Sequence, residues 1–180
     1  MAPSAARGEC PPAWVAGVGT PGTNGDVSAT AVLPGGDVIV GGVFTTAGGV
    51  SASRIARYNP STGVWSALGA GANGHVSAIV VLPGGDVIAG GSFTTAGGVS
   101  ANRIARYTPR TGVWSALGSG TNAGVFTLAV LPGGDVIVGG VFTTAGRLPA
   151  NRIARYNPST GIWSALGSGT NDWVNALAVL

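Results

Sequence analysis

The stretch VLPGGDVIVGGVFTTA, residues 32–47, recurs unchanged at residues 130–145, and a third copy at residues 81–96 differs from it only at Ala89 and Ser92. Within these copies LPGGD recurs every 49 residues. Self-similarity at a period of roughly 20–50 residues is typical of repeat architectures, in which each repeat is one supersecondary unit. The chain is therefore a tandem array, and the fold of one unit decides the fold of the whole.

Each unit contains four short apolar runs separated by turn sequences. In the middle unit these runs are VSAIVVL (76–82), DVIAGG (86–91), RIARY (103–107) and VWSALG (113–118). The first run is almost wholly apolar, as expected of a strand covered on both faces, and PGG and TPRTG supply tight turns. No segment shows an apolar period of about 3.6 residues with caps. The sequence predicts an all-β chain of antiparallel four-stranded units with essentially no helix.

The spacing of glycine and aromatic residues in each unit resembles the kelch repeat. A glycine doublet ends the second run, as at Gly41 and Gly42, and a Tyr is followed seven residues later by a Trp, as in YNPSTGVW from Tyr58 to Trp65. The resemblance covers residues 27–180 and implies that the units are blades of a β-propeller. The FTTAGG element is also similar to repeats of secreted bacterial propellers, which favours an extracellular or cell-surface location. No signal peptide is visible, so the location stays open.

The period of 49 residues divides the chain into blades. The predicted segments are a tail (1–13), the end of a preceding blade (14–26), three blade repeats (27–75, 76–124 and 125–173) and the first strand of a following blade (174–180). Closed propellers have about four to eight blades. We therefore expect an open arc or a fragment of a longer array, whose exposed strand edges allow self-association.

Composition excludes several classes of function. Charged residues make up 8% of the chain, and the net charge of +3 comes from nine basic residues, all Arg. This charge is too sparse for a nucleic-acid partner, and no apolar run reaches the ~18 residues that membrane insertion requires. Because Cys10 and His75 are the only residues of their types, we expect no disulfide within the chain, no metal site and no cofactor. Kelch-like propellers include copper-radical oxidases such as galactose oxidase, but that activity does not carry over to repeats with one His.

Several polar and aromatic residues recur once per blade, which favours a structural role. The turn Asp could close the first hairpin or pair with an Arg, rather than form an acidic ring. The arginine pairs could contact Asp and aromatic rings, or form a basic track for acidic glycan or nucleic acid. The Tyr and Trp are expected to pack between and within blades. These residues are Asp37, Asp86 and Asp135; Arg54, Arg57, Arg103, Arg106, Arg152 and Arg155; Tyr58, Tyr107 and Tyr156; and Trp65, Trp114 and Trp163.

Differences between the copies gather in two kinds of loop, which emerge on the same face of an up-and-down blade. One joins the second strand to the third, and the other joins the fourth strand to the next blade. Loops on a rigid scaffold are where recognition usually resides. The Asn of these connections also recurs in register from Asn24, so a turn-forming role for it stays open. The candidate ligand-binding residues are Asn73, His75, Asn122, Arg147, Asn171, Asp172 and Trp173.

These observations favour a non-catalytic recognition propeller that binds protein or glycan through the variable loops. A purely structural spacer in a bacterial surface protein is the alternative. A hydrolase using Asp172 or His75 is a third hypothesis, although the set supplies no nucleophile, base and orienting group together. No catalytic residue is predicted.

Overall fold

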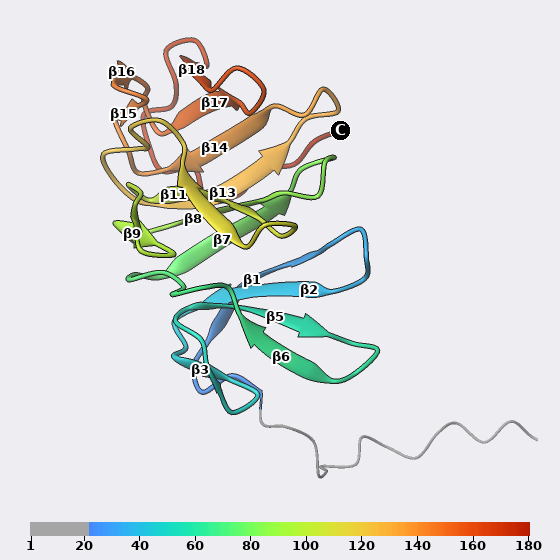
Figure 1. Cartoon of the computed structure of the whole chain (residues 1–180). Coiled ribbons are helices and arrows are strands. Elements are labelled where there is room, and N and C mark those ends of the chain that lie inside the picture. The colour runs from blue at the N-terminus through green and yellow to red at the C-terminus, as the bar shows by residue number, and fades with distance from the viewer. Residues whose placement is uncertain (1–21) are drawn as a thin grey trace, which may run out of the picture.

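The computed structural model describes residues 22–180, which form three antiparallel four-stranded sheets, one for each repeat (Figure 1). The predicted tail 1–13, Cys10 and most of the segment 14–26 lie outside the described residues. The all-β prediction is confirmed, and the described residues contain no helix. Blade 1 consists of β1 (Val27–Val32), β2 (Val38–Gly42), β5 (Ile55–Asn59) and β6 (Val64–Ala67); blade 2 of β7 (Val76–Val81), β8 (Val87–Gly91), β11 (Ile104–Thr108) and β12 (Val113–Ala116); blade 3 of β13 (Val125–Val130), β14 (Val136–Gly140), β17 (Ile153–Asn157) and β18 (Ile162–Ala165).

Strand order within each blade follows the chain, as the turn sequences predict. In blade 2 the order is β7-β8-β11-β12, and every neighbouring pair is antiparallel. The first turn closes where the Leu82 amide donates to the Asp86 carbonyl at 2.8 Å. Pro83 presets the backbone for this turn, and Gly85 takes a φ of +85° that glycine adopts without strain. Short turns of this kind leave each blade an up-and-down sheet.

The loop between the second and third strands of each blade contains a small hairpin that the sequence did not predict. Its paired segments are two residues long, and in blade 1 the glycines between them, Gly48 and Gly49, have φ of +57° and +79°. These pairs are too short to show strand periodicity. The hairpins are β3 (Thr46–Ala47) with β4 (Val50–Ser51), β9 (Thr95–Ala96) with β10 (Val99–Ser100), and β15 (Thr144–Ala145) with β16 (Leu148–Pro149).

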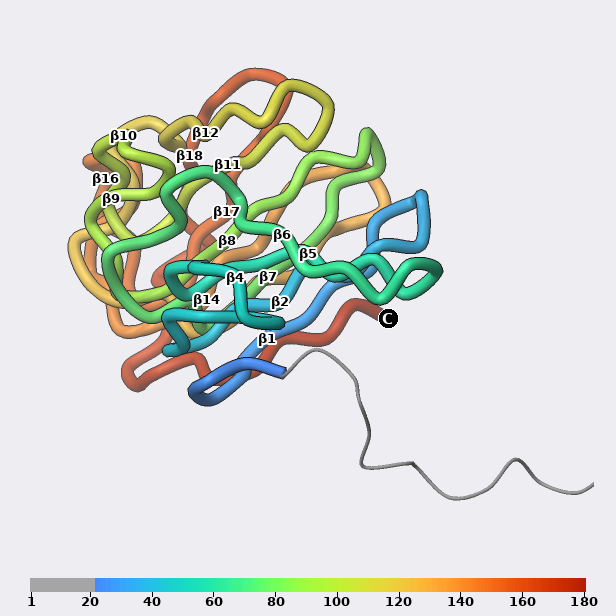
Figure 2. Tube along the Cα trace, turned by 60° about the horizontal axis from the view of Figure 1, so that its bottom comes forward, coloured from blue at the N-terminus to red at the C-terminus, as the bar shows by residue number. Residues whose placement is uncertain are grey.

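The blades succeed one another around an axis that lies near their first strands. Strand β7 packs against both β1 and β13, whereas the fourth strands lie at the outer side of the array (Figures 1 and 2). Residues 174–180 form no strand. Even so, Val174 lies next to Gly139 of blade 3. Val76 lies next to Gly41 of blade 1 in the same way.

Two of the three hydrophobic clusters among the described residues lie between adjacent blades, and the third lies within blade 1 around Phe44. Ile39 and Ile55 of blade 1 pack with Val87 of blade 2, and Ile88 of blade 2 packs with Val136 of blade 3. Because the residues of β8 alternate between these two interfaces, all five of them are buried. A blade therefore needs neighbours on both sides to complete its core.

The glycine doublets set the distance between blades. A Cβ added to Gly90 would lie 2.5 Å from Cγ1 of Val125 in the next blade. A Cβ added to Gly91 would collide with the backbone oxygen of His75, which precedes the first strand of the same blade. The first glycine thus admits a valine of the neighbouring blade, and the second lets β7 lie close to β8.

The recurring Trp packs within its own blade and bonds to the preceding one. Trp114 lies across from Tyr107 with ring centroids 5.1 Å apart, and its indole N–H donates to the Leu68 carbonyl of blade 1 at 2.9 Å. Trp163 makes the same bond to Leu117 of blade 2 at 2.9 Å. The prediction that these aromatic residues pack within and between blades is confirmed.

Trp114→Ala should lower the free energy of unfolding by roughly 3–5 kcal/mol, because it removes a buried ring and the interblade hydrogen bond from its indole to the Leu68 carbonyl. Trp114→Phe should lower it less, since most of the packing remains. Urea denaturation followed by circular dichroism measures both. Equal stability of Trp114→Ala and the parent chain would contradict the interblade role.

Gly90→Ala should cost about 1–3 kcal/mol of stability, because its methyl group overlaps Val125. Gly84→Ala is the matched control, since a Cβ there meets nothing within 4 Å. Combined with Val125→Ala, the Gly90→Ala cost should be smaller than in the parent chain, because the overlapping methyl is gone. Strict additivity in the same denaturation experiment would count against the contact.

Candidate functional site

The array has two chemically different faces. We call "loop face" the side that carries the second-to-third loops and the connections 69–75, 118–124 and 167–173 between blades. We call "turn face" the side that carries the LPGGD turns and the turns between third and fourth strands. Backbone bridges from Ala72 to Ala96 and from Thr121 to Ala145 join each connection to the next blade's loop, which keeps the loop face continuous.

On the turn face each Asp pairs with the second Arg of its own blade. Arg106 Nε donates to Asp86 Oδ2 at 2.6 Å, Thr108 Oγ1 donates to the same oxygen at 3.2 Å, and the pairs Asp37–Arg57 and Asp135–Arg155 repeat the arrangement. The predicted structural pairing of Asp with Arg is confirmed. These six charges neutralise one another within the blades.

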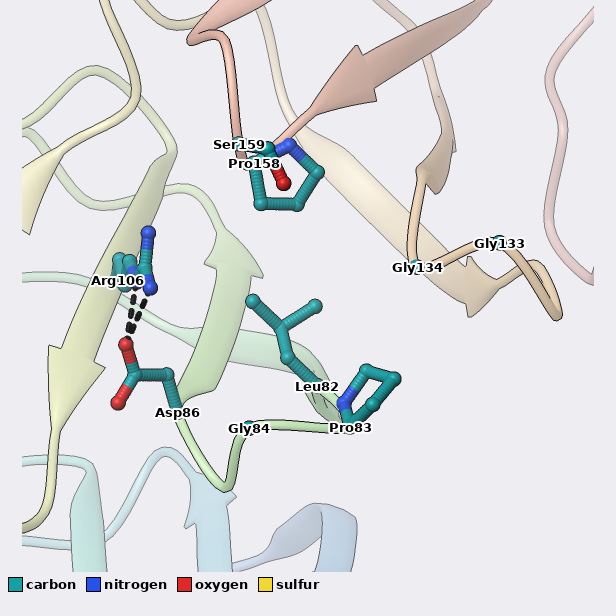
Figure 3. Close-up of a pocket in the computed structure, with 9 residues that line it drawn as sticks. All are labelled: Leu82, Pro83, Gly84, Asp86, Arg106, Gly133, Gly134, Pro158 and Ser159. Atoms are coloured by element: carbon teal, nitrogen blue, oxygen red, sulfur yellow. Dashed lines mark hydrogen bonds and ion pairs between the residues drawn. The ribbon is translucent and has the colours of Figure 1, made fainter.

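A hollow of about 320 Å³ lies beside this ion pair, between blades 2 and 3. Figure 3 shows Leu82 and Pro83 on the blade 2 side, with Pro158 and Ser159 opposite them on blade 3. A second hollow of about 430 Å³ shares Asp86 and Arg106 and extends to Arg110. The charge of Arg106 is already balanced by Asp86, so the first hollow offers a ligand mainly backbone and proline surface, and the second adds the single guanidinium group of Arg110.

On the loop face the recurring Asn fastens each connection to the following blade. Asn73 Oδ1 accepts the backbone N–H groups of Thr94 and Thr95 at 2.8 and 2.9 Å, and its Nδ2 donates to the Thr94 hydroxyl at 2.8 Å. Asn24 and Asn122 make the same three bonds in blades 1 and 3. The role is structural, but it is not the local turn role considered for this Asn: the bonds reach residues 21 and 22 positions along the chain, and Asn24, Asn73 and Asn122 are not among the residues with positive φ.

Between blades 2 and 3 the loop face contains a polar cavity of about 330 Å³, which we call the junction cavity. It carries two guanidinium groups, from Arg103 of blade 2 and Arg147 of blade 3, and no carboxylate. The lining residues are Asn102, Arg103, Ser119, Gly120, Thr121, Asn122, Thr144 and Arg147. A more open hollow of about 600 Å³ repeats part of this lining at Asn151, Arg152 and residues 168–171.

A second group of variable side chains gathers at the start of the first strands, near the axis. Nε2 of His75 lies 2.7 Å from Oγ of Ser28 in the neighbouring blade, and its Nδ1 lies 3.4 Å from Oγ of Ser77. Trp173 meets Phe126 edge to face with centroids 6.1 Å apart. Ser28, Ser77 and Phe126 each stand at a β-bulge, a feature that redirects a side chain.

The comparisons with known proteins agree with this architecture. Residues 18–129, more than half of the chain, match the family model of the Rax2 C-terminal beta propeller domain. The chain belongs to this family. Residues 132–160 match a second propeller model, a beta-propeller domain of unknown function, DUF5122. Neither is a kelch model, so the kelch assignment stays a prediction. A comparison with curated proteins gives no significant match.

Two solved structures share the fold of this Rax2-family propeller. The extracellular domain of a putative one component system from B. thetaiotaomicron has a TM-score of 0.53 at 15% identity, over 82% of this chain and 18% of that chain. The extracellular domain of a putative hybrid two component system from the same organism has a TM-score of 0.53 at 16% identity, over 79% and 16%. The chain spans less than a fifth of either structure, and at these identities the likeness shows the fold alone.

The structure distributes the predicted ligand-binding residues of this Rax2-family propeller over several places. It brings Asn122 and Arg147 together in the junction cavity, and it places His75 in the axial group. Asn171 lies in the open hollow. Asp172 accepts the backbone N–H of Trp173 through its own Oδ1 at 2.7 Å. Asn73 is occupied by its three structural bonds.

Sequence reasoning missed Asn102, Ser28 and Phe126, and it favoured a structural role for Arg103. Ser28, Ser77 and Phe126 occupy one repeat position within a strand, and only the loops were compared for differences. A register-by-register comparison of the strands would have found that position. Arg103 recurs in every blade, so a comparison of the copies does not identify it as a candidate ligand-binding residue.

The Ser28–His75 pair has the spacing of a nucleophile and its base. Within residues 22–180 the imidazole of His75 contacts two serine hydroxyls and no carboxylate. A catalytic triad would need a carboxylate there to orient the base. In the same range no cluster of three or more His, Cys, Asp or Glu side chains is placed to hold a metal ion. The described part of the chain also has no apolar helix of the length needed to cross a membrane.

Burial raises the pKa of Tyr156 above its ordinary value of 10.0, and the positive Arg106 partly offsets this rise. The folded state therefore resists ionisation of the phenol more than the unfolded chain does. Stability should fall as the pH rises above about 10, where the unfolded tyrosine ionises first. Tyr156→Phe should lose this part of the alkaline decline, as measured by urea denaturation from about pH 8 to about pH 11. An unchanged decline in the variant would contradict the assignment to Tyr156.

Proposed function

We propose that this propeller is a non-catalytic recognition module that binds a glycan or protein ligand through its loop face. The observation that carries the proposal is the junction cavity, where two arginines without an ion pair meet polar side chains from two blades. The rigid interblade packing holds these groups in place before a ligand arrives, which lowers the entropic cost of binding.

The turn face supports this choice by contrast. Its arginines at positions 57, 106 and 155 are paired with Asp, and Arg110 is its one arginine outside the three ion pairs of the described residues. At the junction cavity of the loop face, by contrast, Arg103 and Arg147 are both outside these pairs and face one cavity. An unpaired guanidinium keeps its full capacity to bind an anionic or carbonyl group of a ligand. The kelch-like Tyr and Trp fit the same proposal, because they supply the scaffold and leave recognition to the loops. An extracellular location, which the two structural neighbours have by name, is part of the proposal.

A purely structural spacer is the second candidate function. It is favoured by Asn24, Asn73 and Asn122, whose side-chain amides are all used in hydrogen bonds that hold each connection to the following blade. We call these residues the Asn clamps. In that case substitutions that leave folding intact would be silent at the loop face.

Two substitutions separate these candidates. Arg147→Gly restores the residue that stands at the same repeat position in Gly49 and Gly98, and it removes one positive charge from the loop face. Arg110→Ser does the same on the turn face, where the equivalents are Ser61 and Ser159. Each variant therefore carries the same change in net charge and a residue that the fold already accepts.

On glycan and peptide arrays, Arg147→Gly should weaken binding of the best ligand by about tenfold or more, because a charged hydrogen bond is lost. Arg110→Ser should bind like the parent chain. Circular dichroism and the unfolding midpoint of each variant control for folding. Arrays with no ligand, or a ligand equally sensitive to both variants, would favour the spacer.

A further inference from the structure

We propose that the junction cavity is a binding site for a sugar that bears an anionic group, a carboxylate or a sulfate. This inference rests on the proposed function and names its ligand class. Arg103 and Arg147 would hold the anionic group, and Asn102, Ser119 and Thr144 would bind the hydroxyl groups of the ring.

The backbone at Arg147 is the first indication that this side chain is retained for a ligand. Arg147 has a φ of +73°, while the equivalent Gly49 and Gly98 have φ of +79° and +82°. A left-handed backbone is strained for a residue that has a Cβ, so arginine is the less stable choice here. Its guanidinium makes no hydrogen bond or ion pair within the described residues that would offset this cost. Arg54, Arg103 and Arg152 also have positive φ, but they recur in every blade, whereas Arg147 stands where the other two blades have glycine.

Comparison of two complete junctions shows that four residues of the cavity lining differ between them. Between blades 1 and 2 the positions of Asn102, Ser119, Thr121 and Arg147 are held by smaller or less polar residues, namely Ser53, Ala70, Ala72 and Gly98. Three of these differences add a polar or charged group to the junction of blades 2 and 3, and the fourth replaces a serine hydroxyl by the larger amide of Asn102. Backbone architecture is the same at both junctions, so the fold itself does not require these groups.

The arginine of the first junction is also engaged differently. Arg54 donates through Nη1 to the Ala72 carbonyl at 3.1 Å, which fixes its guanidinium against the connection. Arg103 is half-buried and makes no such bond to the described residues. The second junction therefore holds two uncommitted guanidinium groups where the first holds one that is bonded.

The charge and the wall of the cavity both suit an anionic sugar. No Asp or Glu lines it, so an anion there would face two positive groups and no negative one. Asn102 is held by its Nδ2 bond to the Ser119 carbonyl at 3.0 Å, which leaves its Oδ1 open as an acceptor. Asn122 is fixed by its bonds to Thr143 and Thr144. Pre-positioned amides and hydroxyls of this kind are the partners that sugar hydroxyls use.

Other anionic ligands fit the lining less well. A nucleotide base would lack an aromatic ring to stack on, because none lines the cavity. A peptide would lack a pocket for a large apolar anchor residue, since no aliphatic or aromatic side chain lines the cavity. The volume of about 330 Å³ matches a single sugar ring with its substituents.

The test titrates the full chain with four probes, D-glucuronate, D-glucose 6-sulfate, D-glucose and inorganic sulfate, followed by nuclear magnetic resonance. At least one anionic sugar should bind about tenfold more tightly than glucose and than inorganic sulfate, since only it uses both the arginines and the polar wall. Which of the two anionic sugars binds more tightly distinguishes carboxylate from sulfate recognition.

Arg147→Gly should reduce this affinity about tenfold or more, and Arg147→Lys should recover part of it, because lysine keeps the charge and loses the planar fork. Arg110→Ser should leave it unchanged. Equal binding of glucuronate, glucose 6-sulfate and glucose, or binding by inorganic sulfate as tight as by either anionic sugar, would overturn the inference.

The array experiment tells a failure of this inference from a failure of the proposed function. A neutral glycan or a peptide that depends on Arg147 would refute the anionic sugar and leave the recognition function standing. The absence of any ligand that depends on the loop face would refute both.

Discussion

The contact on which the rest of the structure depends is that of a first-strand valine with the glycine of the preceding blade. Val76 and Val125 lie where a side chain at Gly41 and Gly90 would be. This contact sets how closely two sheets approach, and the indole bonds of Trp114 and Trp163 can form only at that approach. Because hydrophobic clusters lie between blades, the same distance also decides whether those clusters are filled.

The repeated architecture separates residues that hold the fold from residues that can bind a ligand. A residue that serves the contact between blades must recur in every copy, as the Asp–Arg pairs, the Asn clamps and the Tyr–Trp pairs do. Recognition of a ligand needs no such recurrence, because one binding site is enough. Arg147 at the junction cavity and the side chains at the bulges depart from the repeat, while the scaffold beneath them stays constant.

Much of the fold could be predicted from the period and its turn sequences. Strand position, blade number among the described residues and the pairing of Asp with Arg all followed from spacing and residue type. The hairpins after Phe44, Phe93 and Phe142 could not be predicted, since two-residue strands carry no periodicity. Of the candidate site, Asn122 and Arg147 were identified as variable loop residues, but their proximity to Arg103 and Asn102 came from the packing of blades.

The sequence by itself determined that this chain is a tandem array of four-stranded units with variable connections, because local turn chemistry and alternation of apolar residues act over short distances. Only the tertiary structure decided which polar side chains are used in contacts that hold the blades together. Asn73 and Asn122 look alike in the sequence, and both are clamps, yet only Asn122 borders a cavity with two free arginines. That difference arises where residues from two blades meet, and contacts across blades are set by packing rather than by the order of residues in one repeat.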